Sequence, residues 1–478
     1  MNTGVWVRAI VPFAAFILVL CLPGSVFFMP GITIVEQRLI AIFILAALCW
    51  VLEPIPIYTT SILVIVLQLF LVSDKGLAFF TRSSPAEEMG KLLSHQTLMA
   101  TFASPIIMLF LGGFFLAIAA TKYRLDINLA RVMLKPFGQR PGAVLFGLML
   151  ITAVFSMFMS NTATTAMMLS ILVPVLKQFP VDDRGRIAFI LSVPVAANIG
   201  GIGTPIGTPP NAIALKYINE IAPISFGQWM LFGVPFVMVL LAFSWWLLGR
   251  LFPVSTKVLS LDIKGRFLKN WQAIVVYITF GLTILLWLIG GQFGLNSYVV
   301  AMLPVAVFSC TRIVNKEDMQ TISWDVLWLV AGGIALGIGL EDTGLASRVI
   351  ASIPFAQASA IVVLLGAMLL TLAMANFMSH TATANLLLPL MAVLATNLPG
   401  LESIGSAITI LLAVTFSASL GMSLPISTPP NALASATGQI GTADMAKVGV
   451  IIGLVGLVLT LVMLWLLHIL GGQGAVVK

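Results

Sequence analysis

Residues 158–164 read Phe-Met-Ser-Asn-Thr-Ala-Thr, and residues 377–383 read Phe-Met-Ser-His-Thr-Ala-Thr. Residues 205–212 read Pro-Ile-Gly-Thr-Pro-Pro-Asn-Ala, and the same stretch returns at 425–432 with a single change. A third pair, Gly-Gly at 112–113 and again at 332–333, has the same spacing. Because the three pairs are separated by 219, 220 and 220 residues, the sequence predicts an internal repeat.

The composition of the chain points to lipid as its main solvent. Of the 478 residues, 60% are hydrophobic and 9% are charged, with a mean hydropathy of +1.10. A soluble domain carries roughly 25% charged residues. No stretch is polar enough to form a separate catalytic domain outside a membrane. The net charge of +7 lies in basic residues between apolar segments, which favours a role in topology over nucleic-acid binding.

Clusters of charged residues divide the chain into eleven predicted membrane spans, since a span needs about 20 apolar residues. Two further segments, 142–176 and 359–395, are too long for one helix and short for two, and each has a polar centre. We expect both to be re-entrant helical hairpins with buried tips. The predicted spans are 8–30, 34–52, 56–72, 98–121, 187–215, 226–248, 272–290, 296–313, 324–341, 403–435 and 445–470.

The distribution of basic residues predicts the orientation of these spans. With a cytoplasmic N-terminus, 17 of the 24 Lys and Arg residues lie on the cytoplasmic side, as the positive-inside rule requires. The first hairpin then enters from the cytoplasm and the second from outside. The predicted fold is therefore an all-α polytopic membrane protein with about eleven transmembrane helices and two re-entrant hairpins in an inverted repeat, which is typical of alternating-access transporters.

The repeated motifs carry polar groups suited to a small ion. Ser160, Asn161 and Thr162 favour helix caps and turns, and their side chains can donate to an anion or offer oxygens to a cation. The Thr-Pro-Pro-Asn stretches at 208–211 and 428–431 are expected to break their spans, because proline removes a backbone donor. Helix N-termini exposed by such breaks suit a carboxylate, and freed carbonyls suit sodium.

The absence of basic residues from these segments bears on the mechanism. No Lys or Arg occurs in 141–176, 187–215 or 349–446. A divalent anion held there needs more positive charge than one helix terminus supplies, so we expect coupling to a cation, either sodium or protons. His380, which stands where the first motif has Asn161, can donate a hydrogen bond to a carboxylate and could also titrate.

At these residues the chain resembles the divalent anion/sodium symporter family, the INDY-type carriers of dicarboxylates, citrate and sulfate. The resemblance covers nearly the whole chain and rests on residues 160–162, their counterpart at 379–381 and the two Thr-Pro-Pro-Asn stretches. It implies a homodimer in the bacterial cytoplasmic (inner) membrane, in which each protomer has a scaffold and an elevator-like transport domain. The implied division is scaffold at 1–121 and 249–341, and mostly transport domain at 122–248 and 342–478.

The resemblance also implies roles for individual residues. Asn161, Thr162 and Thr381 would bind substrate carboxylates. Ser160 and Asn161, with backbone near Gly203, would help form one sodium site, and Ser379, with backbone before Pro425, the other. The full predicted substrate site is Ser160, Asn161, Thr162, Thr208, Pro210, Ser379, His380, Thr381, Thr428 and Pro430.

One departure from the family pattern leaves the mode of transport open. His380 replaces the asparagine that the family commonly carries. The first hypothesis is a sodium-coupled carrier of a C4-type di- or tricarboxylate with no resident cofactor. The alternative is a sodium-independent exchanger or a proton-coupled carrier on the same fold. An intramembrane enzyme lacks a catalytic constellation here, and a channel lacks a charged or carbonyl-lined filter.

Overall fold

A computed structural model describes residues 3–27, 29, 31–81, 85–180, 182–259, 265–352, 359–398 and 400–469. Within these residues the regular elements are helices, and the only extended pairing is an isolated bridge between Ser73 and Leu93. The all-α prediction is therefore confirmed. The first half contains α1 (Thr3–Cys21), α2 (Ile34–Leu52), α3 (Ile57–Leu71), α4 (Ala78–Thr81), α5 (Ala86–Met89), α6 (His95–Ala100), α7 (Pro105–Lys122), α8 (Leu125–Leu134), α9 (Pro141–Ser156), α10 (Asn161–Leu176), α11 (Gly185–Gly201), α12 (Pro209–Ile221) and α13 (Phe226–Leu251).

The second half follows a similar order. It contains α14 (Trp271–Ile289), α15 (Ser297–Cys310), α16 (Lys316–Met319), α17 (Trp324–Asp342), α18 (Leu345–Ser352), α19 (Ala360–Phe377), α20 (His380–Asn397), α21 (Ala407–Ser419), α22 (Pro429–Ala436) and α23 (Thr442–Ile469). Shifted by about 220 positions, α7–α13 fall on α17–α23 one by one. The internal repeat thus extends over seven consecutive helices.

Several helices are long and apolar enough to cross a bilayer. Among the described residues, seven segments meet this length and composition, including α2, α13, α17, α19 and α23, and further apolar helices of 10–17 residues accompany them. The apolar segments predicted from sequence therefore fold as helices. The first arm of the second predicted hairpin, α19, is itself long enough to span.

Two predicted spans have boundaries that differ in the structure. The span expected over 8–30 ends as a helix at Cys21, ahead of Pro23, because proline disfavours helical backbone at the residue before it. The span expected over 98–121 is interrupted, and its main helix begins at Pro105 with the Ser104 hydroxyl accepting from Ile107 N. Proline is favoured at the first helical position, where its missing N–H has no helical partner to lose.

The polar motifs interrupt helices where the sequence predicts. In the first repeat α9 ends at Ser156 and α10 begins at Asn161, capped by the Ser160 hydroxyl, which accepts from Ala163 N at 3.2 Å. In the second repeat the Ser379 hydroxyl caps α20 and accepts from Ala382 N at 3.1 Å. Each Thr-Pro-Pro-Asn stretch likewise starts a new helix, α12 or α22, after an unwound segment.

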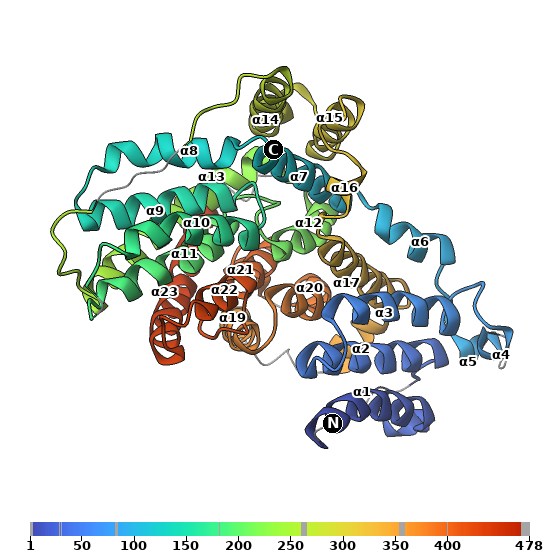
Figure 1. Cartoon of the computed structure of the whole chain (residues 1–478). Coiled ribbons are helices and arrows are strands. Elements are labelled where there is room, and N and C mark those ends of the chain that lie inside the picture. The colour runs from blue at the N-terminus through green and yellow to red at the C-terminus, as the bar shows by residue number, and fades with distance from the viewer. Residues whose placement is uncertain are drawn as a thin grey trace.

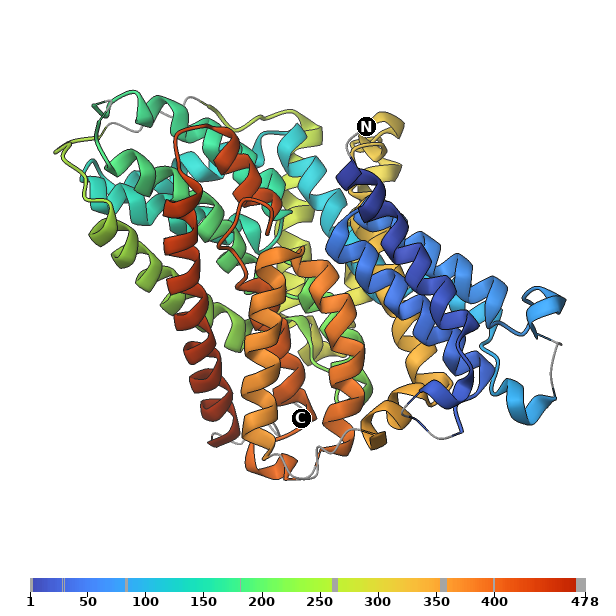
Figure 2. The same cartoon turned by 90° about the horizontal axis from the view of Figure 1, so that it is seen from below.

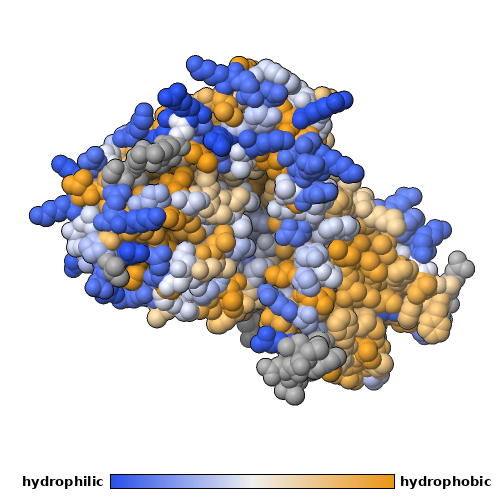
Figure 3. Space-filling view, in the orientation of Figure 1, coloured by the Kyte–Doolittle hydropathy of each residue, from blue (hydrophilic) through white to orange (hydrophobic). Residues whose placement is uncertain are grey.

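The helices form two groups that meet at the middle of the molecule. The blue helices α1–α3 lie together on one side, and α9–α13 lie with α19–α23 on the other (Figures 1 and 2). Helix α17 packs on both α3 and α20 and so joins the groups. Hydrophobic side chains cover the lobe of α1–α3, and hydrophilic ones gather along the left and upper rim (Figure 3). The interrupted helices of both repeats thus face the junction.

Candidate functional site

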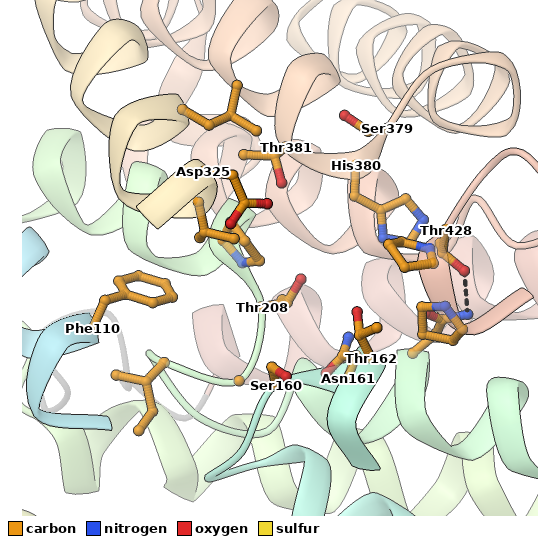
Figure 4. A pocket seen from close by; sticks show the side chains of 18 of the residues that line it. Phe110, Ser160, Asn161, Thr162, Thr208, Asp325, Ser379, His380, Thr381 and Thr428 are labelled. Atoms are coloured by element: carbon orange, nitrogen blue, oxygen red, sulfur yellow. Dashed lines mark hydrogen bonds between the residues drawn. The ribbon is translucent and has the colours of Figure 1, made fainter. Parts of the chain in front are cut away.

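A cavity of about 360 Å³ lies where the two motif pairs meet. This volume is at the lower end of the roughly 300–1,000 Å³ typical of small-molecule pockets. Its walls come from α3, α7 and α17 on one side and from the starts of α10, α12, α20 and α22 on the other. Residues about 220 positions apart therefore share one cavity, with the tip residues of α10 facing those of α20 (Figure 4).

Four helices present their N-terminal residues to this cavity. The lining residues Asn161 and Thr162 open α10, His380 and Thr381 open α20, and Pro209 and Pro429 open α12 and α22. The N-termini of α10 and α20 each carry a partial positive charge of about one half. Helices α12 and α22 each begin with two prolines, which have no N–H, so these two termini offer fewer donors. Among the described residues, the cavity lining contains no Lys or Arg. The arrangement suits a small anion, held by helix termini and hydroxyls.

Nine of the ten predicted substrate residues line this cavity. They are Ser160, Asn161, Thr162, Thr208, Ser379, His380, Thr381, Thr428 and Pro430. Pro210 is not among the lining residues, whereas its neighbour Pro209 is. Gly203, expected beside Asn161, instead has its carbonyl against Gly233 of α13. The backbone close to the Asn161 amide belongs to Gly201.

The tip of the first repeat, the turn between the end of α9 at Ser156 and the start of α10 at Asn161, is rich in hydrogen-bond acceptors. The Ser156 hydroxyl lies within hydrogen-bonding reach of both Asn161 Oδ1 and the Ala197 carbonyl, the latter at 2.7 Å. A hydroxyl has one hydrogen, so it satisfies only one of these oxygens at a time. A Cβ at Gly201 would lie 2.9 Å from the Gly207 carbonyl oxygen and 3.0 Å from Asn161 Oδ1. Glycine at 201 thus permits these oxygens to approach the backbone closely.

The tip of the second repeat is organised differently. His380 is buried, and its Nε2 lies 2.7 Å from the Gly421 carbonyl oxygen. A carbonyl can only accept, so Nε2 carries the hydrogen, and a neutral ring has no further N–H to donate. Asn376 Oδ1 accepts from Ser423 N at 2.8 Å, and the Asn376 carbonyl accepts from the Ser427 hydroxyl at 2.9 Å. The hydrogen-bond donation expected from neutral His380 to a substrate is therefore already used.

Two equivalent asparagines hold the unwound segments in shape. Asn211 Nδ2 has two hydrogens and lies within hydrogen-bonding distance of three carbonyl oxygens, those of Gly201, Ile202 and Thr204, with the last at 2.8 Å. Asn431 Nδ2 donates to the carbonyls of Met422 and Leu424, at 2.8 and 3.0 Å. The asparagine of each Thr-Pro-Pro-Asn stretch thus satisfies carbonyls that proline and unwinding leave without helical partners.

Some lining residues lie outside the predicted motifs. Asn198 of α11 donates from Nδ2 to Thr428 Oγ1 at 3.2 Å and to Asn431 Oδ1 at 3.1 Å, and so ties the first repeat to the second. Asp325, at the start of α17, reaches the cavity near Thr381 (Figure 4). A single Asn within an apolar run was the available signal for Asn198. The sequence held no signal for Asp325, because the helix dipole alone makes acidic residues common in the first turn of a helix.

A second cavity, of about 1,060 Å³, lies on the other side of α7 and the turn before α12. Leu109 and Pro205 line it, whereas their neighbours Phe110 and Ile206 line the first cavity. Its remaining wall includes the start of α13 and the connection between α14 and α15. The two cavities therefore adjoin at α7 and at the turn before α12.

Comparison with known proteins identifies the family. Residues 4–471 match the family described as the sodium:sulfate symporter transmembrane region. The chain is 34% identical over 388 residues to an uncharacterized transporter of Haemophilus influenzae, covering 76% of this chain and 81% of that one. It is 30% identical over 470 residues to the sodium-dependent dicarboxylate transporter SdcS of Staphylococcus saprophyticus, covering 90% and 85%.

The fold also has a solved counterpart. The crystal structure of the Alcanivorax borkumensis YdaH transporter matches with a TM-score of 0.57 at 15% sequence identity, over 87% of this chain and 98% of that one. At that identity the likeness concerns the fold alone. The family match over residues 4–471, nearly the whole length, shows that this chain belongs to the sodium:sulfate symporter family. The protein is a membrane transporter rather than an enzyme, and the family resemblance predicted from the motifs is confirmed.

Proposed function

We propose that this chain carries a small di- or tricarboxylate of the C4-dicarboxylate type across the bacterial cytoplasmic membrane, coupled to sodium. The observation that carries the proposal is the convergence of four helix N-termini on a cavity whose described lining has no Lys or Arg. Helix N-termini favour an anion, and the hydroxyls between them can donate to carboxylate oxygens. The staphylococcal relatives named as sodium-dependent dicarboxylate transporters support both the substrate class and the ion.

The binding roles follow from the positions of the donors. Asn161 and Thr162 would hold one carboxylate at the start of α10, and Thr381 would hold the other at the start of α20. Ser160 and Ser379 cap these helices, so their main role would be to fix the tips. Asp325 would oppose a second negative charge in the same cavity, which favours joint binding of substrate and cation.

The first repeat fits a sodium ion as co-substrate. Ser156 Oγ lies close to both Asn161 Oδ1 and the Ala197 carbonyl oxygen, and the Asn161 amide lies beside the backbone of Gly201. Sodium sites in transporters are built from such unwound carbonyls and side-chain oxygens. Positive charge beside Asn161 would raise the affinity for a carboxylate at Thr162, which is the physical basis of coupling.

The transport movement we propose is of the elevator type. The segments 122–248 and 342–478 would move together, because they contain both tips and both unwound segments. The segments 1–121 and 249–341 would form the stationary scaffold, with α7 and α17 along the boundary. The two cavities on either side of α7 would then become alternate routes to one site. A homodimer would hold the scaffolds against each other in the bilayer.

A second mode of transport on the same fold is favoured by His380. A sodium-independent anion exchanger would need no cation site and could use an imidazole in the second repeat. The same site would bind the anion in both modes, so the two proposals differ only in what accompanies the substrate.

The test is uptake of labelled succinate into proteoliposomes at fixed pH, with an inward gradient of either sodium or choline chloride. Sodium-coupled transport predicts saturable uptake that requires the sodium gradient. Uptake that ignores sodium but is stimulated by succinate preloaded inside would replace symport with exchange. Absence of uptake for succinate, citrate and sulfate alike would overturn the proposed substrate class.

A further inference from the structure

We propose that the second repeat binds no sodium, because the N–H of His380 takes the place of a bound cation there. The inference rests on the proposed anion carrier and concerns its coupling ions. In a repeat protein the two tips are expected to be equivalent, and the family resemblance implies one sodium site at each. The two tips of this chain differ in the balance of donors and acceptors, and that difference carries the proposal.

At the first tip, position 161 supplies a side-chain oxygen, Asn161 Oδ1, close to the Ser156 hydroxyl. Asn161 Oδ1 and the Ala197 carbonyl share the single hydrogen of Ser156. Side-chain oxygens beside an unwound helix are the kind of ligand that sodium takes in transporters. A sodium ion at the first tip would therefore use Asn161 Oδ1 as a ligand.

At the second tip, position 380 supplies an N–H in place of that oxygen, and the acceptors around it each have a hydrogen. The Gly421 carbonyl accepts from His380 Nε2, Asn376 Oδ1 accepts from Ser423 N, and the Asn376 carbonyl accepts from Ser427. The Ser423 hydroxyl is buried without a partner in the described part of the chain, but one hydroxyl does not make a cation cage. Ser379 Oγ is engaged as the cap of α20.

The backbone also differs between the repeats around this contact. Helix α11 continues to Gly201, whereas α21 ends at Ser419, two residues before the equivalent position Gly421. The Gly201 carbonyl is held by Asn211, while Asn431 makes no such bond to Gly421. Unwinding therefore turns the Gly421 carbonyl towards the ring, and His380 donates to it. A cation placed at that oxygen would have to displace a charge-free N–H donor from a buried bond.

The consequence is an asymmetric carrier with one sodium site. The anion would be held between a cation-bearing tip and a tip whose donor is built into the chain. His380→Asn would replace the imidazole N–H by an amide side chain with an oxygen, as at Asn161 in the first repeat. This variant should therefore gain a sodium site at the second tip.

The experiment measures the melting temperature of the purified protein in detergent against sodium chloride, with choline chloride keeping ionic strength constant. A ligand that binds only the folded state raises stability with its concentration. Asn161→Ala should abolish the sodium-specific rise, and Asn161→Ala combined with His380→Asn should restore it. Combining Asn161→Ala with His468→Asn, which alters an exposed histidine near the end of α23, is the matched control and should restore nothing.

The possible outcomes distinguish the single sodium site from sodium coupling itself. A sodium response that survives Asn161→Ala would mean that the second repeat binds sodium despite His380 and would overturn the inference. The inference also fails if neither His380→Asn nor the double variant gains a response. A wild-type protein without any sodium response, together with a His380→Asn protein that acquires one, would support the inference and refute sodium coupling.

A measurement on the unaltered chain removes dependence on variant folding. If uptake requires sodium, its rate should rise with sodium concentration with a Hill coefficient of about 1, because cooperativity is bounded by the number of sites. A coefficient near 2 in the wild type would overturn the single-site proposal.

Discussion

Replacing Thr381 by valine removes one hydroxyl from the proposed site and leaves the shape of the side chain almost unchanged. Thr381 lines the cavity in the first turn of α20, and within the described residues its hydroxyl makes no hydrogen bond to the protein. The hydroxyl is therefore available to a substrate carboxylate. Its loss should weaken substrate binding without leaving a protein group unpaired.

The size of the effect follows from the kind of bond. A hydrogen bond to a charged group contributes about 1.5–3 kcal/mol, and each 1.4 kcal/mol is roughly tenfold in affinity. Thr381→Val should therefore raise the dissociation constant for succinate by about 10- to 150-fold. Its melting temperature without substrate should stay close to that of the wild type.

The assay is equilibrium binding of labelled succinate to purified protein, followed by the concentration dependence of uptake. Thr383→Val is the matched control, because Thr383 lies two residues further along α20, is fully buried and also has no hydroxyl partner in the described structure. Thr383→Val should leave affinity unchanged. Succinate affinity within twofold of wild type for Thr381→Val would refute the role assigned to this hydroxyl.

Three further predictions concern packing and charge away from the anion. Gly112→Ala places a Cβ against the Ala301 carbonyl of α15 and should destabilise by about 1–3 kcal/mol, whereas Gly366→Ala, with open space around it, should not; thermal melting compares them. Glu341→Gln leaves the mostly buried Lys216 ammonium, 3.7 Å away, without its partner, so it should lower the melting temperature more than joint replacement of both by Gln. Asp126 lies in α8, outside the spanning helices, and burial raises the pKa of its carboxyl, so ionisation of this group destabilises the folded state. Asp126→Asn should therefore be more stable than the wild type at pH 8. The difference in stability should shrink as pH falls, because the carboxyl then protonates in the folded and the unfolded state alike, and thermal melting across pH measures it.

Much of this architecture follows from sequence because the polar motifs are rare exceptions in an apolar chain. Ser160, Ser379 and the two Thr-Pro-Pro stretches stop or start helices through their own local chemistry, so their effect needs no knowledge of tertiary contacts. Their repetition indicated that the two tips share one site, and the cavity brings them together.

Other features depend on contacts between distant segments and leave no local signature. Asn198 meets Thr428 across the repeat boundary, and Asp325 reaches the cavity only because α17 packs beside α20. Gly203 was expected beside Asn161, but Trp229 of α13 donates to the neighbouring Ile202 carbonyl and Gly233 packs on Gly203. Packing of α13 thus decides which carbonyls face the tip, and the motif alone does not contain that information.

The most direct test of the proposed anion site is a cryo-electron microscopy map of the purified protein saturated with succinate. We expect density for a two-carboxylate molecule between Asn161 and Thr162 at the start of α10 and Thr381 at the start of α20. Density only in the second cavity, beside Asn219 and Tyr298, or an empty first cavity at saturating succinate would contradict the proposed site.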